Sequence, residues 1–352
     1  MNIPFAKARI GEEEIKAVEK VMRSGWLTRG KVCQEFEEKF AEYVGAKYAI
    51  SLNSCTSALF LALKYYTDVN CVSVFNVAVP AFTFTASASI IKHCKKDIKF
   101  VDVRKDNYCI DENKIQDNLN SHVISVHLTG NKSVTKLDRK FIIEDSAHRI
   151  ERNTQGDNPV CYSFYATKNM TTGEGGMLTT NDENVYSFIK KAMLHGTNKD
   201  GFARYANKAS WEYTIDFTGW KMNMTDLMAA IGIEQLKKLD AMNARRKEII
   251  DLYNKNLNYN NTGLHLFPIF VNERAKFMDY MLENGIHCSC HFLALHKMPA
   301  YKEYNGLVLP NTERLSSTEV SLPLYPDLTD EEVNYISEKV LQSGLLIKKE
   351  EV

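Results

Sequence analysis

Near the middle of the chain, Lys168 stands between two segments that would suit an amine nucleophile. The run from Tyr162 to Thr167 is built of aromatic and small residues, and the turn after the lysine is rich in glycine. An apolar flank removes water from an ammonium group and lowers its pKa, which an amine needs in order to attack a carbonyl. Ser163 and the N–H groups of the glycine turn could hold an anion beside it. A lysine beside a glycine turn is also a common solvated loop residue, so this segment alone leaves both interpretations open.

A carboxylate upstream favours the chemical interpretation. The segment 140–145 (KFIIED) has the pattern of a short buried strand that ends in Glu144 and Asp145. Open α/β sheets place their sites at the carboxyl ends of strands, so we expect Asp145 at such an edge. A Schiff-base lysine and a carboxylate that pairs with a pyridinium nitrogen are the combination used with pyridoxal 5′-phosphate (PLP). Lys168 and Asp145 together therefore predict PLP chemistry.

Two motifs around these residues carry a family resemblance. IIEDSAH at 142–148 and YSFYATKNMTTGEGGMLTTND at 162–182 resemble the cofactor core of the DegT/DnrJ-type nucleotide-sugar aminotransferases. That family is a branch of the aspartate-aminotransferase-like (fold-type-I) PLP enzymes. The resemblance extends from IPFAKARIGEEEIKAV near the N-terminus to GIHCSCHFLALH at 285–296. It implies an α/β fold, with a mostly parallel sheet between helices in a large PLP-dependent-transferase domain and a smaller α+β C-terminal domain.

The resemblance also implies roles for single residues. Lys168 would bind the cofactor covalently and, once released, move a proton as general base and acid, while Asp145 would keep the pyridine nitrogen protonated. His148 matches a position near the 3′-oxygen of the cofactor, and Phe84 matches the aromatic side chain that stacks on its ring. The residues that the resemblance places around the cofactor phosphate are Thr56, Ser57, Ser163 and Lys221.

Two of these phosphate residues also have an ordinary structural explanation. Thr56 and Ser57 lie in a turn between a strand expected at 47–52 and a helix expected at 59–65, and hydroxyl residues at a helix start are common N-caps. A strand that turns into a helix is at the same time an anion site, which agrees with the phosphate role that the resemblance implies.

Lys221 departs from the commoner pattern of the family. Many relatives have Asn at this position and Arg where Asn223 stands. In those relatives the Asn reaches the cofactor phosphate of the neighbouring subunit. Because a lysine can bind phosphate as a point charge, the resemblance implies the same contact for Lys221, with Asn223 as a polar neighbour. This arrangement implies a homodimer with shared active sites.

The K-x-N-x-T-D pattern at 221–226 recurs among relatives that aminate C4 of a 4-keto nucleotide sugar. The resemblance therefore implies transfer of an amino group from L-glutamate to a nucleotide-linked keto sugar, in the first instance C4 of a 4-keto-6-deoxy dTDP- or UDP-sugar. C3 amination of a 3-keto nucleotide sugar is an alternative. A PLP-dependent sugar dehydratase (lyase) is another, although relatives of that class have His in place of the lysine. A regulatory, non-catalytic protein is disfavoured because Asp145, Ser163 and Lys168 are all present.

Two further segments are candidates for sugar binding. The loop 25–30 (GWLTRG) could simply end a helix, but by resemblance Trp26, Leu27 and Thr28 approach the substrate. Lys31 follows this loop where relatives usually have Pro. Near the C-terminus, the resemblance places His291, and less clearly His296, near the substrate.

The segment 287–291 (HCSCH) looks at first like a metal site. On a strand, which we expect over 286–292, His287 and His291 would share one face and the two cysteines the other. Four ligands divided between two faces cannot converge on one ion, so we expect no metal.

Composition bounds the class of protein. The 352 residues are 44% hydrophobic, and equal numbers of basic and acidic residues (44 each) give no argument for nucleic acid or membrane partners. Eight scattered cysteines and an N-terminus without an apolar signal core favour the cytoplasm. Alternating short strands and helices predict a largely parallel sheet, with a helix at 111–119 between two strands. We expect a cofactor-binding large domain at 1–241 and a small domain at 242–352.

Overall fold

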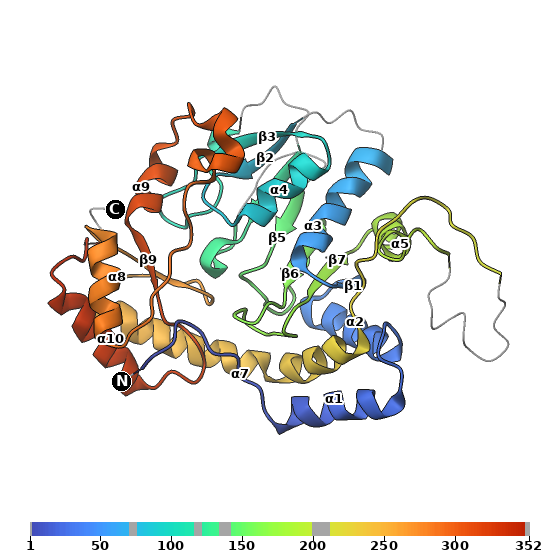
Figure 1. The fold of residues 1–352 in the computed structure, drawn as a ribbon, viewed down its shortest axis with the longest axis horizontal. Helices are drawn as coiled ribbons and strands as arrows, with labels where there is room; N and C mark the ends of the chain where they lie inside the picture. Colours follow the sequence, from blue (N-terminus) through green and yellow to red (C-terminus); the bar gives the residue numbers. More distant parts are fainter. Residues whose placement is uncertain (1, 70–75, 116–121, 134–141, 199–211, 349–352) are drawn as a thin grey trace.

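Residues 2–69, 76–115, 122–133, 142–198 and 212–348 are described by the computed structural model of the chain (Figure 1). They form a large α/β layer structure and, beside it, a smaller group of elements from the C-terminal third of the chain.

Seven strands form the central sheet, in the order β1-β7-β6-β5-β4-β2-β3. Within it β7 is antiparallel to both of its neighbours, while the pairs from β6 to β3 are parallel. The predicted mostly parallel sheet is therefore confirmed. In chain order the strands are β1 (Tyr48–Leu52), β2 (Asn76–Pro80), β3 (Asp97–Val101), β4 (His122–Val126), β5 (Ile142–Asp145), β6 (Val160–Ser163) and β7 (Gly176–Thr180).

Helices cover both faces of the sheet, so most residues of its strands are buried, although Asp97 and Lys99 of the edge strand β3 are exposed. Alternate residues of β6 show the two faces: Cys161 belongs to the core cluster that includes α3, α4 and α5, whereas Val160 and Tyr162 belong to the cluster that includes α2 and α7. The helices of this layer are α1 (Glu12–Ser24), α2 (Lys31–Val44), α3 (Cys55–Lys64), α4 (Thr85–His93), α5 (Glu183–Ala192) and α7 (Asp226–Leu257).

The long helix α7 connects the two parts of the molecule. It begins at the Thr225 cap and passes from beside α1 and α2 to α10 (Asp330–Gln342) on the other side (Figure 1). The carboxylate of Asp226 accepts hydrogen bonds from the N–H groups of Gly30 (2.7 Å) and Cys33 (3.0 Å), so the first turn of α7 also caps the start of α2. The expected domain boundary at 241/242 falls inside this unbroken helix, and the division itself stays a prediction.

The smaller group is built around an antiparallel pair of strands, β8 and β9. One expectation for this region is wrong: the segment 286–292 is not a strand, because its backbone makes only isolated bridges, from Ile286 to Ile3 and from Ser289 to Ser321. The segment thus pairs with one neighbouring chain segment at Ile286 and with another at Ser289, and neither pairing extends into a ladder. The elements of the group are β8 (Phe267–Phe270), α8 (Arg274–Glu283), α9 (Pro310–Thr318), β9 (Glu319–Leu322) and α10.

The helix expected at 111–119 is not continuous where the structure describes it. Residues Glu112–Lys114 form a single 3-10 turn, and Ile115 returns to an extended conformation. The side chain of Asp111 accepts a hydrogen bond from the N–H of Asn113 and so favours this short turn. The remainder of the expected helix, 116–119, lies outside the described residues.

Close packing of α7 on α2 gives a stability prediction. A Cβ at Gly232 would lie 2.6 Å from the ring of Phe36, which is fully buried. Gly232→Leu should therefore lower the free energy of unfolding by about 1–3 kcal/mol through overpacking. The matched control is Ala241→Leu, which adds leucine at an exposed position of the same helix and should change stability by less than about 0.5 kcal/mol. Urea unfolding measures both, and equal midpoints for the two variants would contradict the packing argument.

Candidate active site

The carboxyl ends of the parallel strands surround a cavity of about 360 Å³. Because β7 runs in the opposite direction, its first residues lie at the same edge of the sheet as the last residues of β1 and β6. The cavity is lined by the last residues of β4, β5 and β6, by residues of the turns and helices that follow β1, β2, β5 and β6, and by two residues from the C-terminal third: Ser54, Cys55, Thr56, Leu59, Thr83, Phe84, Ala86, Ser87, Val126, Asp145, Ala147, His148, Ser163, Tyr165, Thr167, Lys168, Glu174, Gly175, His291 and Phe292.

Lys168 points its amine into this cavity from the turn after β6. Burial lowers the pKa of its ammonium to about 8, while the nearby carboxylate of Asp145 acts in the opposite direction. The expected desolvation of this lysine is therefore present in the structure. A pKa near 8 leaves a useful fraction of the amine unprotonated at neutral pH, as a nucleophile toward an aldehyde requires.

The glycine turn after Lys168 is required by close packing of backbone on backbone. A Cβ at Gly176 would lie 2.3 Å from the carbonyl carbon of Ser54, in the turn that leads from β1 into α3. Only glycine permits β7 to start so near that turn. The lysine segment and the first turn of α3 are thus held on the same cavity.

Asp145 is 4% exposed at the end of β5. Burial raises the pKa of its carboxyl group, whereas a hydrogen bond from the Ser87 hydroxyl (2.7 Å) and one from the N–H of Ala147 (3.1 Å) favour the ionised form. Ser87 lies in α4, far away in the sequence, and no spacing pattern pointed to it. Its position shows that α4 orients the acid at the base of the cavity.

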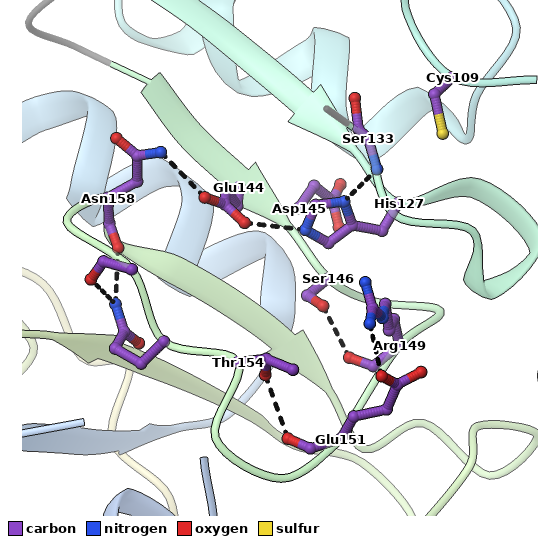
Figure 2. A network of polar contacts seen from close by, with 12 residues as sticks. Cys109, His127, Ser133, Glu144, Asp145, Ser146, Arg149, Glu151, Thr154 and Asn158 are labelled. Carbon is purple, nitrogen blue, oxygen red and sulfur yellow. Dashed lines mark hydrogen bonds and ion pairs between the residues drawn. The ribbon is translucent and has the colours of Figure 1, made fainter. Parts of the chain in front are cut away.

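A second polar network holds the end of β5 from the other face of the sheet (Figure 2). Glu144 accepts hydrogen bonds from Nδ2 of Asn158 and from Nε2 of His127, each at 2.9 Å. The N–H of Ser133 donates to Nδ1 of the same imidazole (3.0 Å), which leaves the ring proton on Nε2. Although burial alone would raise the pKa of Glu144, the bond from His127 lowers it overall. These bonds hold the backbone of Glu144 in place. Because Asp145 is the next residue, its position is fixed by this network as well as by its own hydrogen bonds.

His148 lies in the cavity as a neutral ring. Burial lowers the pKa of its imidazole well below the usual value, and Nδ1 accepts a hydrogen bond from the N–H of Thr129 (3.3 Å). The proton of the neutral ring is therefore on Nε2. His265, which the sequence did not single out, packs against it with ring centroids 4.3 Å apart. This second histidine is brought in from the C-terminal third of the chain by tertiary packing alone.

The structure separates the two hydroxyls predicted for the phosphate turn. Thr56 lines the cavity, whereas the side chain of Ser57 donates to Oδ1 of Asn53 (2.6 Å) and belongs to the capping of α3. Ser54 is the N-cap of that helix, accepts from the N–H of Ser57 (3.1 Å) and also lines the cavity. Ser163 lies on the cavity wall, and its phosphate role stays a prediction.

Other predicted residues lie away from the cavity of the single chain. Lys221 is exposed and donates to Oδ1 of Asn223 (2.6 Å), and the indole of Trp26 donates to the carbonyl of Arg29 (3.1 Å). Leu27 and Thr28 of the same loop are exposed. Their roles in a shared site stay predictions.

The histidines of the C-terminal third have different environments. His291 lines the cavity, His296 is buried against Glu313, and His287 is exposed and bonds to Asn2. Within the described ranges, no group of three or more histidine, cysteine or acidic side chains is arranged to hold a metal ion.

The residues of the cavity fit PLP by their chemistry. The amine of Lys168 suits an aldehyde, and the buried carboxylate of Asp145 suits a pyridinium N–H. The hydroxyls of Ser54, Thr56 and Ser163 lie near the start of α3, where a phosphate is favoured. Phe84, 58% exposed at the N-cap of α4, offers its ring for stacking.

Comparison with known proteins agrees with this arrangement. The family model described as the DegT/DnrJ/EryC1/StrS aminotransferase family matches residues 8–341. An uncharacterized protein of Methanocaldococcus jannaschii, MJ1066, is 37% identical, with 94% of this chain and 95% of the relative covered. The spore coat polysaccharide biosynthesis protein SpsC of Bacillus subtilis is 34% identical, with 96% of each chain covered. A putative sugar aminotransferase of Streptococcus pneumoniae, Spr1654, superposes with a TM-score of 0.86 at 30% identity, covering 97% of this chain and 99% of the other.

A mostly parallel sheet with a partly buried lysine and a buried carboxylate at its carboxyl edge defines the PLP-dependent-transferase class. The chain belongs to the DegT/DnrJ/EryC1/StrS aminotransferase family, of which PLP is the standard cofactor. Among the described helices, even the 32-residue α7 lacks the combination of length and apolar character needed to cross a bilayer.

The pKa of Lys168 gives a testable pH dependence. Because only the free amine attacks an aldehyde, the rate of covalent PLP capture by cofactor-free protein should rise about tenfold per pH unit up to about pH 8 and then level off. Nα-acetyl-lysine, with an amine pKa of about 10.4, is the control and should keep accelerating over the same range. Visible absorbance of the lysine-linked cofactor follows both reactions, and a protein profile that climbs as far as that of the control would refute the lowered pKa.

Proposed function

We propose that the protein is a PLP-dependent sugar aminotransferase that moves an amino group from L-glutamate to a nucleotide-linked keto sugar. The observation that carries this proposal is the pairing of Lys168, whose burial lowers its pKa, with the buried Asp145 across one cavity. The names of SpsC (spore coat polysaccharide biosynthesis) and Spr1654 (putative sugar aminotransferase) support a sugar as the acceptor.

Bound PLP would supply an electron sink for cleavage of the Cα–H bond of the amino donor. The residues of this chain would orient it and move protons. Asp145, held by Ser87 and the N–H of Ala147, would keep a proton on the ring nitrogen. Lys168 would hold the cofactor and then, as a free amine of lowered pKa, carry the proton between carbon atoms. His148, with its proton on Nε2, would donate to an oxygen of the ring.

The regiochemistry belongs to the same proposal. The K-x-N-x-T-D pattern at 221–226 supports amination of C4 of a 4-keto-6-deoxy dTDP- or UDP-sugar, and C3 amination of a 3-keto sugar is the competing outcome. The dehydratase alternative is disfavoured because Lys168, which relatives of that class replace by His, is present and lines the cavity. We further propose that the working assembly is a homodimer with shared active sites.

Replacement of the lysine tests the function. Lys168→Ala should abolish both the visible absorbance of lysine-bound PLP and transamination, because no other amine lines the cavity in the described part of the chain. The substrates are glutamate and a panel of 4-keto and 3-keto dTDP- and UDP-sugars, with amino-sugar formation read by mass spectrometry. Lys237→Ala, at an exposed position of α7, is the control and should keep full activity. Undiminished transamination by Lys168→Ala would refute the proposal, and release of water without amination by the unaltered enzyme would favour the lyase.

The shared site can be tested by mixing variants. If Lys221 contacts the cofactor phosphate of the neighbouring subunit, Lys221→Ala should weaken PLP retention, since one charge-assisted contact worth about 1.5–3 kcal/mol is lost. Mixed with Lys168→Ala protein, it should form heterodimers in which one site lacks both residues and the other is complete. Activity should therefore return above that of either parent.

The opposite geometry predicts no such recovery. If Lys221 serves its own subunit, every site of the heterodimer lacks one residue. Absence of recovery in dimers shown by mass spectrometry to have exchanged subunits would contradict the shared site. Lys255→Ala, at the far end of α7, is the matched control for loss of a surface lysine.

A further inference from the structure

Two residues of β9 form a hydrogen-bonded chain that ends on the cavity. The hydroxyl of Ser321 donates to Oε1 of Glu319 (2.5 Å) and lies 3.0 Å from Nδ1 of His291. The other carboxylate oxygen, Oε2, accepts from the backbone N–H of His291 (2.6 Å). Glu319 and Ser321 are two positions apart on the strand, so their side chains share a face, and both are almost fully buried.

The proton count along this chain fixes the state of the imidazole. An ionised carboxylate can only accept, so the single hydroxyl proton of Ser321 goes to Glu319. The oxygen of Ser321 must then accept from Nδ1–H of His291. Burial, together with the charge of Lys168, lowers the pKa of this imidazole to about 4, so the ring is neutral and has one N–H. Its Nε2 is consequently a lone pair.

The surroundings of Glu319 support the ionised form. Burial raises the pKa of this carboxyl group to about 7, while the bonds from Ser321, His291 and Cys290 favour ionisation, as does the charge of Arg274. The carboxylate therefore predominates at about pH 8, one unit above that value.

The ring of His291 is also held in orientation. Phe5 stacks on it (centroids 5.2 Å apart, planes at 24°), and Phe292 meets it edge to face (5.0 Å, 81°). His291 lines the cavity, and within the described ranges its Nε2 makes no hydrogen bond to the protein. A fixed acceptor is thus available to a bound molecule.

The two substrates of the proposed reaction differ in what they can offer such an acceptor. Apart from the amino group that is transferred, glutamate offers only carboxylates, which accept hydrogen bonds and are repelled by a lone pair, whereas a sugar hydroxyl can donate. We propose that Glu319 and Ser321 are positioning residues that hold His291 as the Nδ1–H tautomer, so that Nε2 accepts a hydrogen bond from a hydroxyl of the keto sugar. The assignment of the sugar rests on the proposed function; the tautomer does not.

Two substitutions distinguish a tautomer fixed by these hydrogen bonds from a purely structural role of Glu319 and Ser321. In Glu319→Gln, the amide oxygen should stay on the N–H of His291, so the NH₂ group faces Ser321. Ser321 then accepts from the amide and donates to Nδ1, and the ring proton moves to Nε2. Ser321→Ala removes the link and releases the tautomer. Ser289→Ala, beside Ser321 in an isolated bridge, is the matched control, because Ser289 contacts Ser321 through backbone hydrogen bonds.

The tautomer is read by nitrogen-15 NMR of histidine-labelled, cofactor-free protein at about pH 8, with His291→Gln identifying the signal. Wild type and Ser289→Ala should show Nδ1–H, and Glu319→Gln should show Nε2–H. Ser321→Ala should show a mixture of the two. An Nε2–H signal in the wild type, or the same tautomer in wild type and Glu319→Gln when both give native melting curves, would overturn the proposal.

Kinetics test the sugar separately. The KM for the nucleotide sugar should rise about three- to tenfold in Ser321→Ala and Glu319→Gln, the loss of one hydrogen bond, while the KM for glutamate does not rise. Equal changes for both substrates, with the tautomer altered as expected, would overturn the role in sugar binding. If the wild type turns over no nucleotide sugar at all, the proposed function fails and the sugar assignment with it, while the NMR result still decides the tautomer.

Discussion

Burial of charge at the end of β5 is the constraint on which the site depends. A carboxylate at 4% exposure costs several kcal/mol unless its partners replace water, and here Ser87 and the N–H of Ala147 do so. The same burial raises the pKa of Asp145 and lowers the pKa of Lys168, so it favours the neutral form of each group. A ligand that brings a ring cation for the acid and an aldehyde for the amine satisfies both groups at once. The cofactor therefore offers the partners that offset the cost of removing water from Asp145 and Lys168.

Two histidines of the cavity are kept neutral by the same loss of water, but their neighbours fix opposite ring protons. A backbone N–H occupies Nδ1 of His148 and leaves a donor on Nε2. The Ser321 hydroxyl at Nδ1 of His291 leaves an acceptor on Nε2 of that ring. Since which nitrogen is protonated follows from the second contact of each ring, the polarity of the cavity is determined by residues outside it.

Much of this could be predicted from the sequence. The strand ending in Asp145, the glycine turn after Lys168 and the strand–helix turn at 53–58 are local patterns, and the structure brings them to one cavity. Residues that reach the site through tertiary contacts could not be found in this way: Ser87 contacts Asp145 from α4, and His265 packs on His148 from near β8.

The expectation of a strand at 286–292 was wrong for the same reason. The segment 286–292 alternates like a strand, but each of its sides has a partner for only one residue, which local pattern cannot show. Ser57 and Thr56 were equivalent by composition. The helix cap distinguishes them, because it directs the Ser57 hydroxyl to Asn53 and leaves Thr56 facing the cavity.

The cap that Asp226 provides has a consequence for how the loop 25–30 and the segment before α7 could be exchanged with those of a relative. Its carboxylate binds Gly30, and its own N–H donates to the carbonyl of Thr28 (3.3 Å), so the loop 25–30 and the segment before α7 are fastened to each other. Lys221 belongs to one of these segments, and Trp26 to the other. The two therefore form one mechanical unit despite nearly two hundred intervening residues. A chimera that exchanges only one of these segments would combine two segments that have not been fitted to each other. The loop 25–30 and the segment before α7 should therefore be exchanged together.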